Sequence, residues 1–86
     1  MEIIAGEFKG RRLLSPPPDV RPIPVLLRKC MFDILGTRIQ GCSFLDGFAG
    51  SGITGIEATS RGAARVDFVE IDRNVVRLLE KNLARL

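Results

Sequence analysis

The glycine-rich stretch FLDGFAGSGITGIE, residues 44–57, constrains the fold of this chain more than any other feature. Gly50, Gly52 and Gly55 follow a short apolar run that ends in an acid, and their spacing is G-x-G-x-x-G. Glycines spaced in this way allow a strand to turn sharply into a helix whose first N–H groups face a ligand, and the last glycine allows close packing of helix on strand. The stretch therefore predicts a strand buried on both faces, a tight turn, and a helix from about residue 51 to residue 61.

The neighbouring segments extend this turn into an α/β pattern. A second apolar run, RVDFVEID, follows the helix, and Asp72 is placed to cap a last helix whose apolar residues recur at three- and four-residue steps. Upstream, VLLRKCMFDILG predicts a helix that stops at Gly36. The order after residue 43 is strand, helix, strand, helix, which indicates a right-handed βαβ unit followed by one more helix. Two parallel strands make an incomplete sheet, so we expect either a fragment of a longer protein or a chain that self-associates through its sheet.

The amino-terminal part has a different character. EIIAGEFKGRRL predicts a β-hairpin, because β-branched residues alternate with glycine turns. Five prolines between residues 16 and 24 then predict an extended, semi-rigid connector. We therefore divide the chain into a basic hairpin with its connector, residues 1–24, and a helix with a partial cofactor-binding domain, residues 25–86.

Composition excludes several classes of protein. The 86 residues include no histidine, so a Ser/His or Cys/His nucleophilic pair is excluded. Cys30 and Cys42 are expected to be small residues in or near the core, and no metal site is expected. No apolar run approaches the ~20 residues of a membrane span, and the first residues do not resemble a signal peptide, so the expected location is the cytoplasm.

The formal charge of +3 is unevenly distributed. Residues 1–42 hold seven Lys and Arg against four acids, whereas residues 43–86 hold six against six. Between Lys9 and Lys29, six cations face only Asp19. A solvated basic face is one interpretation, and an anionic partner such as RNA is the other.

Two acids decide what the glycine turn would bind. Asp46 lies four residues before Gly50, where its charge would repel a pyrophosphate and favour the ammonium and sulfonium of S-adenosylmethionine. Glu70 lies twenty residues after Gly50, at the end of the second strand, where an acid accepts hydrogen bonds from ribose hydroxyls in either cofactor class. An NAD-type dinucleotide site remains the alternative.

At this point the sequence resembles a known family. FLDGFAGSGITGIEATSRGAARVDFVEID resembles the first two cofactor motifs of bacterial methyltransferases that modify guanine N2 in small-subunit (16S) ribosomal RNA. IIAGEFKGRRL resembles the amino-terminal hairpin of these enzymes, and VRPIP with LLRKCMFDILG resembles the segment that follows it. The resemblance implies a Rossmann-like, S-adenosylmethionine-dependent methyltransferase fold, present here as its amino-terminal part.

Carried over residue by residue, the resemblance implies a cofactor site and an RNA-facing segment. The cofactor residues it implies are Asp46, Ala49, Gly50, Ser51, Gly52, Glu70 and Ile71, with Glu70 on the ribose and Ile71 beside the adenine. The residues implied to face ribosomal RNA or the assembling small subunit are Lys9, Arg11, Arg12 and Arg21.

The catalytic motif of the family, Asn/Asp-Pro-Pro followed by Tyr or Phe, is absent from this sequence, and no catalytic residue is assigned. We therefore expect the chain alone to be inactive. A non-catalytic RNA-binding module with a vestigial cofactor loop is the alternative from a different class.

Overall fold

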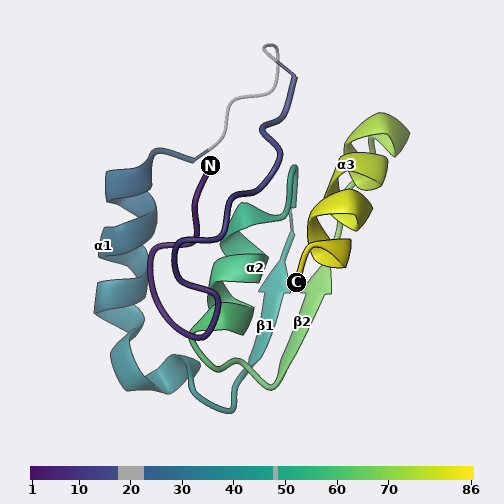
Figure 1. Ribbon diagram of the computed structural model, residues 1–86. Coiled ribbons are helices and arrows are strands. Elements are labelled where there is room, and N and C mark those ends of the chain that lie inside the picture. Colours follow the sequence, from purple (N-terminus) through teal and green to yellow (C-terminus); the bar gives the residue numbers. More distant parts are fainter. Residues whose placement is uncertain (18–22, 48) are drawn as a thin grey trace.

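The computed structural model describes residues 1–17, 23–47 and 49–86. In chain order the elements are α1 (Val25–Leu35), the short 3-10 helix η1 (Gly36–Ile39), β1 (Ser43–Asp46), α2 (Ile53–Ser60), β2 (Arg65–Phe68) and α3 (Arg73–Ala84). Figure 1 shows the two strands side by side, with α2 between them and α1, and α3 beside β2. The predicted order of strand, helix, strand and helix after residue 43 is confirmed.

The two strands form a parallel pair in which Ser43 lies opposite Arg65 and Asp46 lies opposite Phe68. Alternate residues on one face are half-buried, and Phe44 on that face packs against the core below α1 and α2. On the other face Leu45 is 68% exposed. The expectation of a strand buried on both faces is therefore wrong for this chain, because the described elements cover only one face of the sheet.

Helix α1 occupies the predicted residues and ends at Gly36, whose φ of 54° suits a residue without a side chain. Its apolar spacing does not mark its buried face, however. Arg28 and Phe32 are the buried residues of α1, whereas Ile34 is 74% exposed. Cys30 is exposed too, because it lies on the side of α1 away from Arg28 and Phe32, so the expectation that it lies in or near the core is wrong. Cys42 is half-buried.

The amino-terminal segment turns back on itself as predicted but forms a single antiparallel bridge, between Glu2 and Arg12, rather than two strands. The backbone N–H of Ile3 donates to the carbonyl of Arg11 at 3.0 Å beside this bridge. The segment also contacts the helices: Ile3 belongs to a buried cluster with Leu13 and with Ile53 and Ile56 of α2, and the carbonyl of Glu2 accepts from Arg28 of α1. Contacts between the amino-terminal segment and the helices thus take the place of the longer strand ladder that the sequence predicts.

Helix α3 begins where the sequence places its cap. One carboxylate oxygen of Asp72, Oδ1, accepts hydrogen bonds from the N–H groups of Asn74 at 2.9 Å and Val75 at 3.3 Å. Val75 and Leu79 of α3 are buried, in agreement with the predicted apolar face. Within the ranges that the structure describes, no helix has the length and apolar character that crossing a membrane requires.

Candidate functional site

The glycine turn between β1 and α2 contains two residues in the left-handed region, Gly50 with φ 54° and Gly52 with φ 88°. A Cβ on Gly50 would meet no atom within 4 Å, so the space above this residue is open. A Cβ on Gly52 would instead collide with the side chain of Leu79 in α3. Gly50 therefore leaves room for a ligand, whereas Gly52 leaves room for a neighbouring helix.

The Asp46 carboxylate lies at this turn. Its Oδ2 atom accepts a hydrogen bond from the N–H of Gly55, the third residue of α2, at 3.2 Å. The amino terminus of a helix carries a partial positive charge and unsatisfied N–H groups, which attract anions. In this chain a fixed carboxylate already occupies part of that anion-binding position.

Glu70 joins the two loops at the carboxyl ends of the strands. Its Oε1 atom accepts from the N–H of Gly50 at 2.9 Å, and its Oε2 atom accepts from the N–H of Asp72 at 3.0 Å. Hydrogen bonds from Asp72 and Gly50 to the carboxylate hold the pKa of Glu70 below its usual value. Asp46, Gly50 and Glu70, predicted separately from the sequence, are thus brought to one edge of the sheet.

The other predicted cofactor residues fall into two groups. Ala49 and Ser51 are buried, and the carbonyl of Ser51 accepts from Asn82 Nδ2 at 2.8 Å, so these residues shape the turn from beneath. Ile71 is 96% exposed beside Glu70. The turn has open space over Gly50, where a ligand could lie. Glu70 can accept from ribose hydroxyls, the exposed Ile71 can contact an apolar ring, and the Asp46 carboxylate suits a positive charge.

The predicted RNA-facing residues do not form one free basic patch. Lys9, Arg11 and Arg12 are exposed. Arg12 Nε lies 3.4 Å from Glu2 Oε1, and the Arg11 guanidinium lies 4.8 Å from the centre of the Phe8 ring. Arg11 also donates to the carbonyls at the end of the chain, at 3.3 and 3.1 Å. Arg21 lies outside the described residues.

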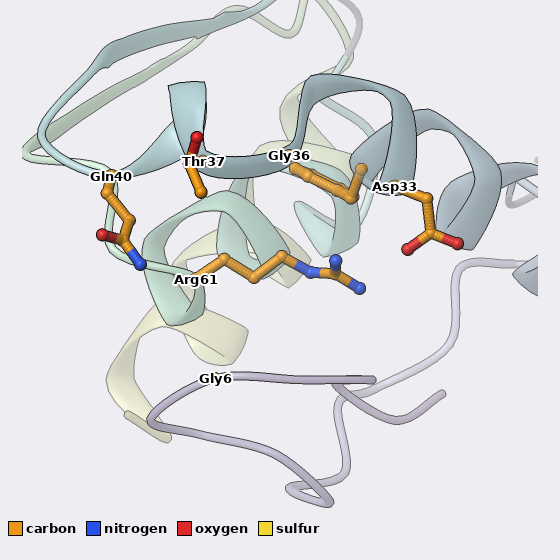
Figure 2. A pocket seen from close by; sticks show the side chains of 7 residues that line it. Gly6, Asp33, Gly36, Thr37, Gln40 and Arg61 are labelled. Carbon is orange, nitrogen blue, oxygen red and sulfur yellow. The ribbon is translucent and has the colours of Figure 1, made fainter.

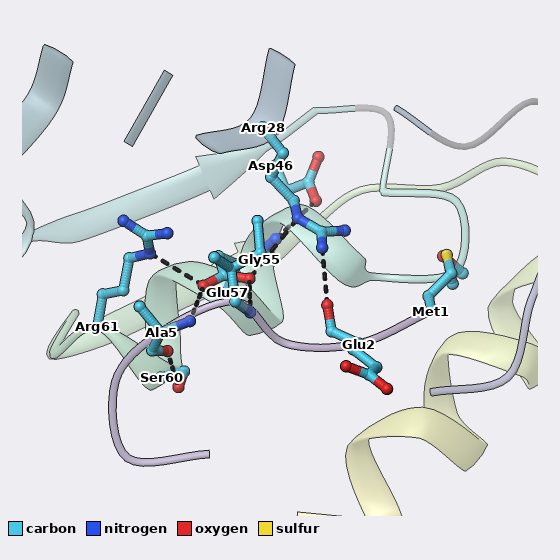
Figure 3. A network of polar contacts seen from close by, with 11 residues as sticks. Met1, Glu2, Ala5, Arg28, Asp46, Gly55, Glu57, Ser60 and Arg61 are labelled. Carbon is cyan, nitrogen blue, oxygen red and sulfur yellow. Dashed lines mark hydrogen bonds and ion pairs between the residues drawn. The ribbon is translucent and has the colours of Figure 1, made fainter. Parts of the chain in front are cut away.

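The structure also contains a buried ionic network that the sequence analysis missed (Figure 3). The Glu57 side chain of α2 is fully buried and accepts from the N–H groups of Ile4 at 2.8 Å and Ala5 at 3.1 Å. It also pairs with Arg61 Nε at 2.9 Å and Arg28 Nε at 3.6 Å. Glu57 therefore links the amino-terminal segment, α1 and α2.

Arg28 is the second charged member of this network and is 2% exposed. Its guanidinium donates to the carbonyl of Glu2 at 2.7 Å, but its Nε atom has no hydrogen-bond partner among the described residues. Burial lowers the pKa of Arg28, the negative charge of Glu57 opposes that shift, and the positive charge of Arg61 adds to it. A charged residue at the centre of an apolar helix, as Glu57 is in GIEAT, is the sequence signal that could have revealed the network.

A hollow of about 420 Å³ adjoins the network at Arg61 (Figure 2). The Arg61 guanidinium lies 4.7 Å from the centre of the Phe32 ring. The residues around it are Gly6, Phe32, Asp33, Gly36, Thr37, Gln40 and Arg61. Three of them lie in or directly after η1, which leads into the amino-terminal end of β1. This hollow is therefore separate from the glycine turn, which lies at the opposite end of the strand.

Comparison with known proteins places these features in a family. The family model described as Conserved hypothetical protein 95 matches residues 1–86. Ribosomal RNA small subunit methyltransferase D of Escherichia coli (strain K12) is 44% identical over 87 residues, which cover 100% of this chain and 44% of that protein. The protein of the same name in Haemophilus influenzae is 41% identical, with 100% of this chain and 45% of that protein covered.

A solved structure agrees in both fold and sequence. The hypothetical protein TTHA0928 of Thermus thermophilus matches with a TM-score of 0.87 and 44% identity, covering 99% of this chain and 49% of that one. The chain thus spans about half the length of the relatives that it matches. Because the family model matches all 86 residues, the chain belongs to the Conserved hypothetical protein 95 family, and the curated relatives above are ribosomal RNA small subunit methyltransferases by name.

Proposed function

We propose that this chain is the amino-terminal part of an S-adenosylmethionine-dependent methyltransferase that acts on N2 of guanine in small-subunit ribosomal RNA. The names of its relatives support ribosomal RNA as the substrate and methyl transfer as the reaction. The observation on which the cofactor assignment depends is the position of the Asp46 carboxylate, which accepts from the Gly55 N–H at the start of α2.

The charge of Asp46 separates the two cofactor classes. Two unit charges 4 Å apart interact by about 1 kcal/mol in water and about 4 kcal/mol near a protein surface. With a pyrophosphate over the turn this energy is repulsive, and with an ammonium or sulfonium it is attractive. The Gly55 N–H, one of the donors that a phosphate would need, is also already bonded. Both effects favour S-adenosylmethionine over a dinucleotide such as NAD.

Glu70 and Ile71 would hold the nucleoside end of the cofactor. Each carboxylate oxygen has two lone pairs, so Glu70 can accept from ribose hydroxyls while it keeps its bonds to Gly50 and Asp72. Ile71 offers an exposed apolar surface for the adenine. S-adenosylmethionine supplies an electrophilic methyl group, and the residues of this chain bind and orient it.

The chain lacks the groups needed to complete the reaction. Methyl transfer to the exocyclic amine of guanine needs a polar acceptor at that amine and a surface on which the base is stacked. The Asn/Asp-Pro-Pro-aromatic motif that would provide them is absent from the 86 residues. We therefore expect the chain to bind cofactor without turnover, and its partner to be ribosomal RNA or the assembling small subunit in the cytoplasm.

Calorimetric titration tests the cofactor assignment. We expect S-adenosylmethionine and S-adenosylhomocysteine to bind and NAD not to bind. Asp46→Asn keeps an oxygen that can accept from Gly55 but removes the charge, and it should weaken S-adenosylmethionine binding several-fold. Asp33→Asn removes an exposed acid on α1 and should leave binding unchanged.

Two results of the titration would contradict the proposal. Binding of NAD without either methyl-donor ligand would show that the site is of the dinucleotide class. Equal effects of the Asp46 and Asp33 variants would show that the charge at the turn does not select the cofactor. RNA binding without any cofactor binding would instead favour the non-catalytic RNA-binding module.

A further inference from the structure

A hollow of about 390 Å³ lies between residues 15–17 and helix α3. From α3 it is lined by Asn74, Arg77, Leu78 and Lys81, which share one side of the helix because they are three, four and seven residues apart. We propose that this basic pocket binds the phosphodiester backbone of the RNA substrate. The inference rests on the proposed function and adds a contact surface outside the amino-terminal residues implied by the family resemblance.

The two cations of the pocket are not held in ion pairs by acids among the described residues. Arg77 and Lys81 are exposed, and neither forms an ion pair with another residue in the described part of the chain. They are four residues apart, where like charges on a helix repel each other. Helix α3 as a whole has three cations, Arg73, Arg77 and Lys81, and the single acid Glu80. This positive charge forms no ion pair in the described part of the chain and is suited to an anionic partner.

The wall opposite α3 is held in place. Asn82 is fully buried, with its Oδ1 atom accepting from the N–H of Leu14 at 2.7 Å and its Nδ2 atom donating to the carbonyl of Leu14 at 3.2 Å. Asn82 also donates to the carbonyl of Ser51 in the glycine turn. Pro16 and Pro17 have restricted φ angles, so these two residues of the wall are stiff. The pocket is therefore preformed and linked directly to the proposed cofactor site.

The position of the pocket fits a strand of RNA that approaches the methyl donor. Helix α3 starts at Arg73, directly after the loop that contains Glu70 and Ile71, so the pocket lies near the edge of the sheet where the cofactor would bind (Figure 1). Its lining offers two cations, the Asn74 amide and the Ser15 hydroxyl, with Leu78 as its apolar member from α3. Such donors match phosphate oxygens, and phosphate contacts position a protein on nucleic acid without reading its sequence.

The test measures RNA binding of the 86-residue chain against salt concentration, by fluorescence anisotropy with a labelled single-stranded oligoribonucleotide of mixed sequence. Each phosphate contact to a single strand contributes about 0.7 to the slope of log affinity against log salt. The double variant R77A/K81A should therefore lower that slope by about 1.4 and weaken binding at low salt. The charge-conserving variant R77K/K81R should keep the wild-type slope.

A matched control removes the same charge elsewhere, with Lys29→Ala on α1 and Arg65→Ala on β2, both exposed. If R77A/K81A lowers affinity and slope no more than this control, or if the wild-type chain does not bind RNA, the pocket assignment is wrong. Titration of the R77A/K81A variant with S-adenosylmethionine separates this failure from that of the proposed function. If the R77A/K81A variant binds both S-adenosylmethionine and RNA as the wild type does, the proposed RNA-binding role of the pocket is wrong and the cofactor assignment stands. If the wild-type chain binds no S-adenosylmethionine, the cofactor assignment is wrong.

Discussion

Glu57→Gln is the substitution whose cost can be worked out most directly from the structure. The amide is nearly isosteric with the carboxylate, but its single oxygen can accept from only one of the two N–H groups, Ile4 on Oε1 or Ala5 on Oε2. It removes the negative charge beside Arg28, which is 2% exposed and has a second cation, Arg61, close by. Removing one partner of a buried ion pair typically costs about 3–5 kcal/mol, because the other charge stays buried without compensation.

That cost is large for a chain of this size. A domain of 86 residues is typically stable by about 4–13 kcal/mol, so Glu57→Gln should remove roughly a quarter or more of its stability. The assay is urea unfolding followed by far-ultraviolet circular dichroism. Asp67→Asn makes the same chemical change in an exposed pair with Arg65, whose atoms are 3.1 Å apart, and should cost about 0–1 kcal/mol.

A second variant distinguishes the charge effect from loss of packing. Adding Arg28→Met to Glu57→Gln removes the uncompensated cation, and this double variant should be more stable than Glu57→Gln alone. If Glu57→Gln costs no more than Asp67→Asn, or if Arg28→Met lowers its stability further, the reasoning about the buried charges is refuted.

The remaining predictions concern the turn itself. Gly55→Ala should gain about 1 kcal/mol in helix propensity but lose about 1–3 kcal/mol, because its Cβ would lie 2.9 Å from Cζ of Phe68 and crowd the ring. Thermal unfolding should therefore show a net loss, whereas Gly47→Ala, with no atom within 4 Å of its Cβ, should be close to neutral; equal effects would contradict the packing argument. For Glu70, a folded-state pKa below the usual 4.5 means that its contribution to stability is complete above that pH and is lost as the pH falls through the lower folded value. The difference in urea midpoint between wild type and Glu70→Gln should thus shrink below about pH 4.5, and a difference that stays constant there would show that the amide bonds of the carboxylate do not stabilise the fold.

The sequence predicted the elements well because their signals are local. The positive φ angles of Gly36, Gly50 and Gly52 are properties of single residues, and Asp72 caps the helix that begins at the next position. The close packing of Gly55 on β2 was also predictable, because the third glycine of a G-x-G-x-x-G motif allows the helix to pack closely on a strand.

What the sequence could not show are contacts between distant segments. Glu57 meets the N–H of Ile4 across 53 positions, and Asn82 meets Leu14 across 68. The apolar neighbours of Glu57 can indicate that it is buried, but no local pattern identifies the distant partner of either residue. For the same reason the buried face of α1 was not evident, because it is set by the partner of Arg28 rather than by apolar spacing.

These long-range contacts meet on one short helix. Helix α2 has eight residues, too few to be stable without tertiary contacts. Its first turn receives the Asp46 carboxylate at Gly55, and its last turn binds the amino-terminal segment through Ser60, whose hydroxyl donates to the carbonyl of Ala5 at 2.6 Å. Gly6 is required at this contact, because a Cβ there would collide with the Ser60 carbonyl. The glycine turn and the basic amino-terminal segment are therefore held by opposite ends of the same helix, so a change that shifts one should also shift the other.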